Sequence, residues 1–289
     1  MQGILAPVLT PFDRDLSPDP PRFARFCRSL LEQGCTALAP FGTTSEANSL
    51  SVDERERLLD ALLDAGVPAG KLIPGTGCAA LPDTARLPRK AARAGCAGVL
   101  MLPPFYYKNL SEEGLYRSYA HAIDRSGEAR LRVYLYNIPQ VSGVPIPLRV
   151  IERLLESHPG TVVGVKDSSG DFANTRAMLR AFPGFEVFVG TEKLLLANLR
   201  EGGAGCITAT ANVNAAAIAR AYRERTEERQ REIDAVRSAY EKFPVIPALK
   251  ETIAQRTGDA SWRAVRPPLV ELTPEEREAL QRSVAATPG

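Results

Sequence analysis

The sequence predicts a (β/α)₈ barrel with a C-terminal helical appendage. Short apolar runs rich in Val, Ile and Leu alternate along the chain with longer amphipathic segments. Eight such runs, each followed by a helical pattern, imply parallel strands joined by right-handed crossovers. A doubly wound open sheet is the alternative fold, but no GxGxxG follows the first run and no obvious break separates two halves. We place the barrel in residues 1–222 and the helical region in residues 223–289.

The expected elements alternate in chain order. Leu58, Leu59 and Leu62 recur at helical spacing, and Ser51 with Glu54 forms a capping box at the second helix. The expected strands are Gly3–Val8, Ala37–Pro40, Lys71–Thr76, Gly98–Leu102, Leu131–Asn137, Val162–Lys166, Glu186–Gly190 and Gly205–Thr208. The amphipathic segments between them include Val52–Ala65, Pro82–Ala94, Ser111–Asp124, Leu148–Ser157, Ala173–Ala181 and Leu194–Arg200.

From about Asn212 onward the pattern is helical throughout. Glu227–Tyr240 is highly charged, and we expect it to lie over solvent. Pro244–Pro247 separates it from a helix at Ala248–Arg256. A final helix should start near Thr273, where a proline and two acidic residues follow a threonine cap. These helices exceed what the barrel needs and would form the appendage.

Composition and charge exclude several classes of function. The 289 residues are 44% apolar and 24% charged, as in soluble globular proteins. A formal charge of +2 gives no basic face for nucleic acid, and no apolar stretch approaches the roughly 18 residues needed to span a bilayer. The N-terminus lacks the charged start and long apolar core of a signal peptide. We therefore expect a cytoplasmic protein that binds neither nucleic acid nor membrane.

Metal and triad chemistry are disfavoured as well. The five cysteines are scattered without CxxC pairing, which is typical of reduced thiols packed as small apolar residues, and no metal-site spacing is present. The two histidines, His121 and His158, fall in expected helices away from the strand ends. A zinc-dependent aldolase or a Ser-His-Asp hydrolase is therefore disfavoured, and we expect neither a metal nor a cofactor.

Lys166 is the best candidate nucleophile. It ends the apolar run Thr161–Val165, and a polar turn follows at once. Burial would lower the pKa of this lysine, and the neutral amine could then attack a carbonyl to form a Schiff base. Lys108 and Lys193 also fall near the predicted rim, in more polar surroundings. The alternative is a structural lysine that leaves the strand and reaches solvent.

Other strand ends carry groups that suit imine chemistry. Gly42–Glu46 follows the second strand, residues 103–108 follow the fourth, and the fifth ends at Tyr136 and Asn137. In a barrel these ends meet at one rim. An amine can attack there, a phenol can shuttle protons, and hydroxyl and backbone N–H groups can hold a carboxylate.

Three ordered motifs resemble the dihydrodipicolinate synthase / N-acetylneuraminate lyase family. They are Gly42–Glu46, Tyr136–Pro139 and Gly164–Gly170. The similarity runs from about Ile4 to Asn212, and more loosely through the helical tail. The resemblance implies a (β/α)₈ barrel, usually tetrameric, that works as a class I aldolase on pyruvate or another 2-oxo acid.

The resemblance also implies roles for individual residues. Lys166 matches the Schiff-base lysine, and Tyr136 matches the proton-transferring tyrosine beside it. Thr43 and Thr44 match the loop that holds the carboxylate of the 2-oxo acid, with Thr44 also linked to the tyrosine hydroxyl. Tyr107 matches a tyrosine that a neighbouring subunit inserts beside this pair.

Further positions match the substrate pocket of the family. Gly190 and Ile207 match positions that line it near the bound substrate. Thr191 and Glu192 align with polar residues that touch sugar hydroxyls in the sugar-acid lyases. Equally, Thr191 could simply cap the helix that begins near Glu192.

Departures from the family pattern narrow the expected substrate. Dihydrodipicolinate synthases carry an arginine where this chain has Val141, and a valine cannot make the forked contact that a carboxylate favours. Ala209 replaces a serine expected in sialic acid lyases. Ser45 replaces the glycine usual in its loop, with no functional explanation from the sequence.

The sequence therefore predicts reversible cleavage of a 2-keto-3-deoxy sugar acid to pyruvate and an aldehyde. A 2-keto-3-deoxy acid dehydratase would use the same lysine and tyrosine and stays open. Condensation of the 4-hydroxy-tetrahydrodipicolinate synthase type is disfavoured by Val141. A non-catalytic barrel that binds 2-oxo acids is the third alternative, although a buried lysine that does no chemistry costs stability.

Overall fold

The computed structural model describes residues 1–287, which pack into two compact units. Unit 1 combines Met1–Gln2 with Pro68–Ile207, and unit 2 combines Gly3–Val67 with the chain from Thr208 onward. The two units are defined by the contacts within each of them. The predicted division into a barrel domain (residues 1–222) and a C-terminal helical region (residues 223–289) stays a prediction.

Unit 1 is built on five parallel strands in the order β3-β4-β5-β6-β7. Adjacent strands bring Tyr136, Lys166 and Phe188 into one row across the sheet. The strands are β3 (Val99–Met101), β4 (Val133–Asn137), β5 (Val162–Asp167), β6 (Glu186–Val189) and β7 (Gly205–Ile207). Each matches an expected strand to within about two residues.

The third expected strand, Lys71–Thr76, is not a strand in the structure. It makes only an isolated bridge, Gly75 to Leu100, with Leu100 N donating to Pro74 O at 3.0 Å. Pro74 has no N–H to donate, and Lys71 belongs to a 3-10 turn, η3 (Ala69–Lys71). The segment is therefore extended beside β3 without a regular ladder.

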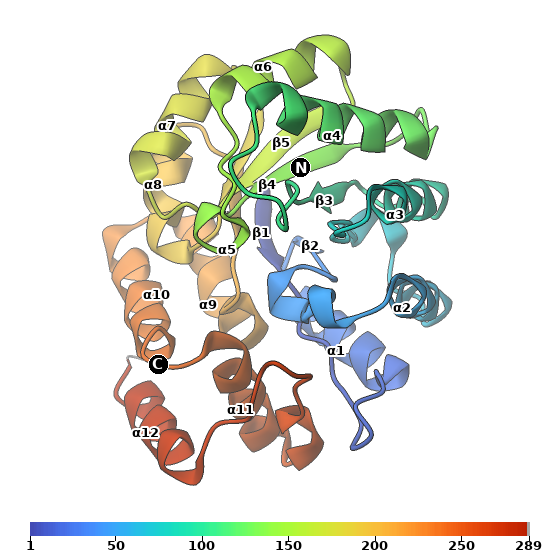
Figure 1. Cartoon of the computed structure of the whole chain (residues 1–289). Coiled ribbons are helices and arrows are strands. Elements are labelled where there is room, and N and C mark those ends of the chain that lie inside the picture. Colours follow the sequence, from blue (N-terminus) through green and yellow to red (C-terminus); the bar gives the residue numbers. More distant parts are fainter. Residues whose placement is uncertain (288–289) are drawn as a thin grey trace. The chain divides into compact units, whose positions relative to one another are not determined.

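Several helices of unit 1 pack on one face of this sheet. Alternate strand residues such as Met101, Leu135 and Val165 pack there against Ile151 and Met178 in one buried core. Figure 1 shows α4 and α6 side by side in this layer. The helices are α3 (Leu81–Arg93), α4 (Glu112–Ser126), α5 (Pro139–Ser142), α6 (Leu148–Ser157), α7 (Phe172–Ala181) and α8 (Leu195–Arg200), with a 3-10 turn η4 (Glu192–Leu194).

Unit 2 contains two short parallel strands and the C-terminal helices. Gly3 begins β1 at φ +133°, where a Cβ atom would lie 2.0 Å from Thr36 Oγ1, so only glycine fits. The elements are β1 (Gly3–Ala6), α1 (Pro20–Glu32), β2 (Ala37–Leu38), η1 (Thr43–Ser45), η2 (Ala47–Ser49), α2 (Val52–Asp64), α9 (Ala211–Glu224), α10 (Glu227–Tyr240), α11 (Val245–Thr257), η5 (Ala260–Arg263) and α12 (Pro274–Ala285).

Local sequence signals set the ends of these helices. Ser51 and Glu54 form the expected capping box of α2, and Thr273 with Glu276 forms another at α12. Helix α10 has the expected bounds but is not wholly over solvent, because Tyr240 joins a core with α11 and α12. Among residues 1–287, no helix is both long and apolar enough to cross a bilayer.

Candidate active site

Lys166 and Tyr136 lie against each other on unit 1. The two residues are register partners on β5 and β4, so their side chains leave the same face of the sheet. Lys166 Nζ lies 4.2 Å from the centroid of the Tyr136 ring, and the side chains are 4% and 3% exposed respectively. No carboxylate of residues 68–207 forms an ion pair with Lys166. The amine is thus buried against an aromatic face rather than leaving the strand for solvent.

Asp167 fixes the ends of the two strands from their opposite face. Its carboxylate accepts hydrogen bonds from Asn137 Nδ2 at 2.9 Å, Asn174 Nδ2 at 3.0 Å and Thr175 Oγ1 at 2.8 Å. These bonds join β4 and β5 to the first turn of α7. Sequence reasoning missed this network, although Asn137 ends one predicted strand and Asp167 directly follows the next.

Gly190 and Ile207 occupy the ends of β6 and β7 in the same sheet. Gly190 N donates to Asp167 O at 2.7 Å, and a Cβ atom at Gly190 would lie 2.0 Å from Ser168 Oγ. Only glycine therefore allows the chain after β6 to pass this close to the turn after Lys166. Ile207 is fully buried.

Thr191 and Glu192 start the 3-10 turn η4. Thr191 is the N-cap, and its Oγ1 accepts a hydrogen bond from Lys193 N at 3.4 Å. This bond gives Thr191 the capping role that the sequence left open. Glu192 is fully buried.

Tyr107 lies at an exposed aromatic tip after β3. Tyr106 and Tyr107 are 76% and 72% exposed, and their rings meet edge to face with centroids 5.4 Å apart. Lys108 fastens the tip, because its Nζ donates to Ser142 O at 2.5 Å and to Phe105 O. Two exposed tyrosines held in place by a neighbouring lysine are suited to contact another surface.

Val141 stands on α5, which directly follows the strand that carries Tyr136. It is 60% exposed and presents an apolar side chain. Gln140 Nε2 donates to Ser168 O at 2.5 Å and ties this short helix to the turn after Lys166. The position thus offers no charge to a carboxylate.

Thr43 and Thr44 belong to unit 2, where they form the turn η1. Thr43 is exposed and Thr44 is 8% exposed. Ser45 Oγ donates to Val8 O at 2.5 Å and accepts from Gly42 N at 3.3 Å, which gives the unexplained serine a structural role. The left-handed residue of this loop is Glu46, with φ 57° and ψ 36°.

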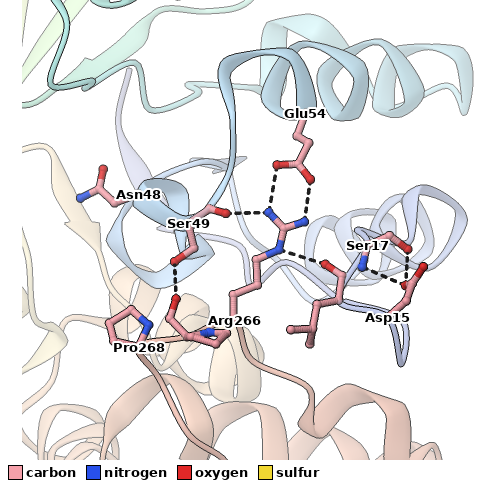
Figure 2. A pocket seen from close by; sticks show the side chains of 9 residues that line it. Asp15, Ser17, Asn48, Ser49, Glu54, Arg266 and Pro268 are labelled. Carbon is pink, nitrogen blue, oxygen red and sulfur yellow. Dashed lines mark hydrogen bonds and ion pairs between the residues drawn. The ribbon is translucent and has the colours of Figure 1, made fainter.

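Unit 2 also contains a pocket of about 470 Å³, lined by residues that include Ser49, Glu54 and Arg266. Figure 2 shows the Arg266 guanidinium in it, bonded to both oxygens of Glu54 and to backbone carbonyls. None of the active-site residues predicted from the sequence lines this pocket. Within residues 1–287, no cluster of three or more His, Cys, Asp or Glu side chains could hold a metal ion.

All five cysteines are free thiols. Burial raises the pKa of Cys35 to about 12, and it does the same for Cys96. Such thiols are poor nucleophiles at neutral pH. These two buried thiols therefore offer no rival to Lys166 for covalent chemistry.

Comparison with known proteins identifies the family of the chain. Residues 1–287 match the family described as the dihydrodipicolinate synthetase family. The chain belongs to this family. An uncharacterized DapA-like lyase from Chloroflexus aurantiacus is 37% identical over 99% of this chain and 98% of its own length. The sequence-based prediction of an enzyme of the aldolase and lyase class is therefore confirmed.

Solved structures of the family share the fold. Dihydrodipicolinate synthase from Agrobacterium tumefaciens is 31% identical, with a TM-score of 0.93 and 99% coverage of both chains. YagE, a family member from E. coli K12 in complex with pyruvate, is 26% identical, with a TM-score of 0.89 over 99% of this chain and 98% of its own. A 2-keto-3-deoxygluconate aldolase variant from Sulfolobus solfataricus is 25% identical, with a TM-score of 0.87 over 98% and 95%. The predicted fold class, a (β/α)₈ barrel with a C-terminal helical appendage, is thus confirmed.

Proposed function

We propose that the chain reversibly cleaves a 2-keto-3-deoxy sugar acid to pyruvate and an aldehyde through an imine on Lys166. The observation that carries this proposal is the buried Lys166 amine, 4.2 Å from the centre of the Tyr136 ring. A buried amine beside a phenol provides a nucleophile and a proton carrier at one point. The family member with bound pyruvate supports a 2-oxo acid as substrate.

The proposed reaction begins at the C2 carbonyl. Lys166 Nζ attacks this carbon, and water leaves as the protonated imine forms. Tyr136 gives its phenolic proton to the departing water and, as the phenolate, then takes the proton of the C4 hydroxyl. The C3–C4 bond breaks, and its electron pair moves toward the imine to give an enamine and a free aldehyde. Protonation of C3 and hydrolysis then release pyruvate and restore the amine.

The remaining predicted residues would hold the substrate. We propose that Thr43 and Thr44 bind the carboxylate and that Tyr107 enters the site from a neighbouring subunit of a homotetramer. Gly190 and Ile207 would line the pocket, and Thr191 and Glu192 would face the sugar hydroxyls. The reaction needs no metal or cofactor, and we place it in the cytoplasm.

Val141 supports a sugar acid over aspartate semialdehyde. Binding the carboxylate of that aldehyde without a charged partner would forfeit roughly 1.5–3 kcal/mol, or about one to two orders of magnitude in affinity. Similarity to the Agrobacterium dihydrodipicolinate synthase favours condensation as a second candidate. A dehydratase would share Lys166 and Tyr136, and a non-catalytic barrel would bind pyruvate without turnover.

A product panel separates these candidates. Purified protein would be given five- and six-carbon 2-keto-3-deoxy sugar acids, and separately pyruvate with aspartate semialdehyde. We expect stoichiometric pyruvate and aldehyde from a sugar acid. Semialdehyde without pyruvate would establish the dehydratase, and turnover only with aspartate semialdehyde would establish the synthase. Pyruvate binding with no turnover would establish the non-catalytic barrel.

A further inference from the structure

Glu46 is held in a backbone conformation that a residue with a Cβ atom seldom adopts. It ends the turn η1 (Thr43–Ser45) with φ 57° and ψ 36°, in the left-handed region. Its N–H bonds to Thr43 O at 3.1 Å, and Ala47 N bonds to Gly42 O at 3.2 Å. A shift of Glu46 would therefore move the turn that carries Thr43 and Thr44. Such a residue persists where its surroundings over-determine it.

The C-terminal region supplies those surroundings. The Glu46 side chain is fully buried; its Oε1 accepts from Lys250 Nζ at 2.5 Å and its Oε2 from Arg266 N at 2.8 Å. Lys250 Nζ also donates to Ala264 O at 2.6 Å and lies 4.3 Å from the centroid of the Phe12 ring. Both carboxylate oxygens are thus fixed by residues more than 200 positions away in the sequence.

Burial disfavours the charged form of Lys250, and the Glu46 carboxylate favours it. Burial lowers the pKa of Lys250 to about 8, against the opposing effect of the Glu46 carboxylate. Arg266 lowers this pKa further, and Glu271 raises it. Buried ion pairs are often no more stabilising than apolar residues of the same size.

Arg266 fixes the other half of the same loop. Its Nη1 donates to Ser49 O at 2.6 Å, and its guanidinium forms a two-pronged contact with Glu54 at 2.9 and 2.6 Å (Figure 2). Its Nε donates to Leu16 O at 2.9 Å. The segment from Gly42 to Leu50, here called the threonine loop, is thus pinned at Glu46 and at Ser49.

We propose that Glu46, Lys250 and Arg266 form a positioning anchor through which the C-terminal helical region sets the threonine loop for binding the 2-oxo acid carboxylate. The anchor rests on the proposed function, because it matters only if the loop binds that carboxylate. Its residues touch no substrate and act through Thr43 and Thr44.

The test compares Lys250→Met with a matched control, Glu251→Gln. Glu251 follows Lys250 on α11, is 2% exposed and pairs with Arg263 at 2.7 Å, outside the threonine loop. Borohydride trapping of pyruvate on Lys166 is followed by intact mass against pyruvate concentration. We expect Lys250→Met to raise the half-saturating concentration about 10- to 100-fold, as a small misplacement of a binding group does, with full labelling at saturation. Glu251→Gln should leave that concentration unchanged.

Either an unchanged half-saturating concentration in folded Lys250→Met or an equal rise in both variants overturns the anchor. Absence of any adduct on the wild-type protein would instead reject the proposed function, and the anchor with it. These two failures are distinguishable because the second is seen before any variant is made.

A second variant covers the case in which Lys250→Met does not fold. Glu46→Gln keeps the shape of the side chain but removes the charge that Lys250 Nζ and the Arg266 N–H contact. The half-saturating concentration of pyruvate should therefore rise in this variant as well, while Glu251→Gln leaves it unchanged. An unchanged half-saturating concentration in folded Glu46→Gln would contradict the anchor.

Discussion

At the scale of single residues, strand alternation explains how Lys166 comes to face a phenol. Val165 joins the core under the helices, and Asp167 bonds to α7 on that same side of the sheet. Lys166, between them, is therefore turned to the opposite face, where its register partner on β4 is Tyr136. A shift of one residue in this register would reverse both arrangements.

Removing the Tyr136 hydroxyl should separate imine formation from bond cleavage. We expect Tyr136→Phe to lower kcat about 10²- to 10⁴-fold, the usual contribution of a positioned proton carrier. The adduct on Lys166 should still form with pyruvate and borohydride. Steady-state pyruvate release and intact mass measure the two steps.

The matched control for this variant is Tyr134→Phe. Tyr134 lies two residues earlier on the same face of β4, and its hydroxyl donates to Glu186 at 2.5 Å. This change removes a hydroxyl to which we assign no role in the reaction, so kcat should be unchanged. Equal losses in both variants would refute the role of Tyr136.

At the scale of elements, Glu54 joins the start of α2 to the segment after η5. Its carboxylate accepts from Ser51 N at 2.8 Å and from the Arg266 guanidinium. These bonds lower the pKa of Glu54 from 4.5 to about 2, with the hydrogen bond from Arg266 as the largest cause. The side chain is 18% exposed, so solvent screens the contact only in part.

This lowered pKa predicts a loss of stability in acid. Glu54 is ionised in the folded state above pH 2, whereas the unfolded chain takes up the proton near pH 4.5. Its contribution is complete above pH 4.5 and is lost as pH falls toward 2. We expect Glu54→Gln to cost about 1–3 kcal/mol of unfolding free energy at pH 6 and much less at pH 2.5, measured by urea titration. The same cost at both pH values would contradict this linkage.

Which elements were predictable depended on whether their signal was local. The capping boxes at Ser51 and Thr273 and the apolar run before Lys166 are each contained within a few residues, and they gave correct helix starts and the central strand. The segment around Pro74 was wrongly predicted as a strand. Its apolar residues suggest a strand, but proline has no backbone N–H to donate to a regular ladder.

The site was predictable only in part, for the same reason. Lys166 and Tyr136 end recognisable strands, and their contact follows from parallel pairing. The bond from Lys250 to Glu46 spans 204 positions, and neither segment carries a local sequence pattern that predicts contact with the other. Packing between distant segments is what the sequence pattern leaves out.

At the scale of the whole molecule, the exposed tip at Tyr106 and Tyr107 predicts association. The change Tyr107→Ala should raise the dissociation constant of the oligomer and lower kcat. An aromatic side chain buried at the centre of an interface contributes about 2 kcal/mol or more to binding. Sedimentation velocity over a concentration series measures the first effect, and pyruvate release measures the second.

Val270→Ala serves as the control for that prediction. Val270 is 75% exposed, a similar exposure to Tyr107, and has no assigned role in assembly. It should leave both association and kcat unchanged. A wild-type protein that is monomeric at all concentrations and fully active would refute the proposal that Tyr107 enters the active site of a neighbouring subunit.

The most direct test of the imine account is borohydride reduction in the presence of pyruvate, followed by peptide mapping. We predict one reduced pyruvate adduct per chain, located on Lys166. Lys166→Ala should abolish both the adduct and turnover, while Lys71→Ala, a change at an exposed lysine of the same unit, should retain both. An adduct on another lysine, or full turnover by Lys166→Ala, would contradict the account.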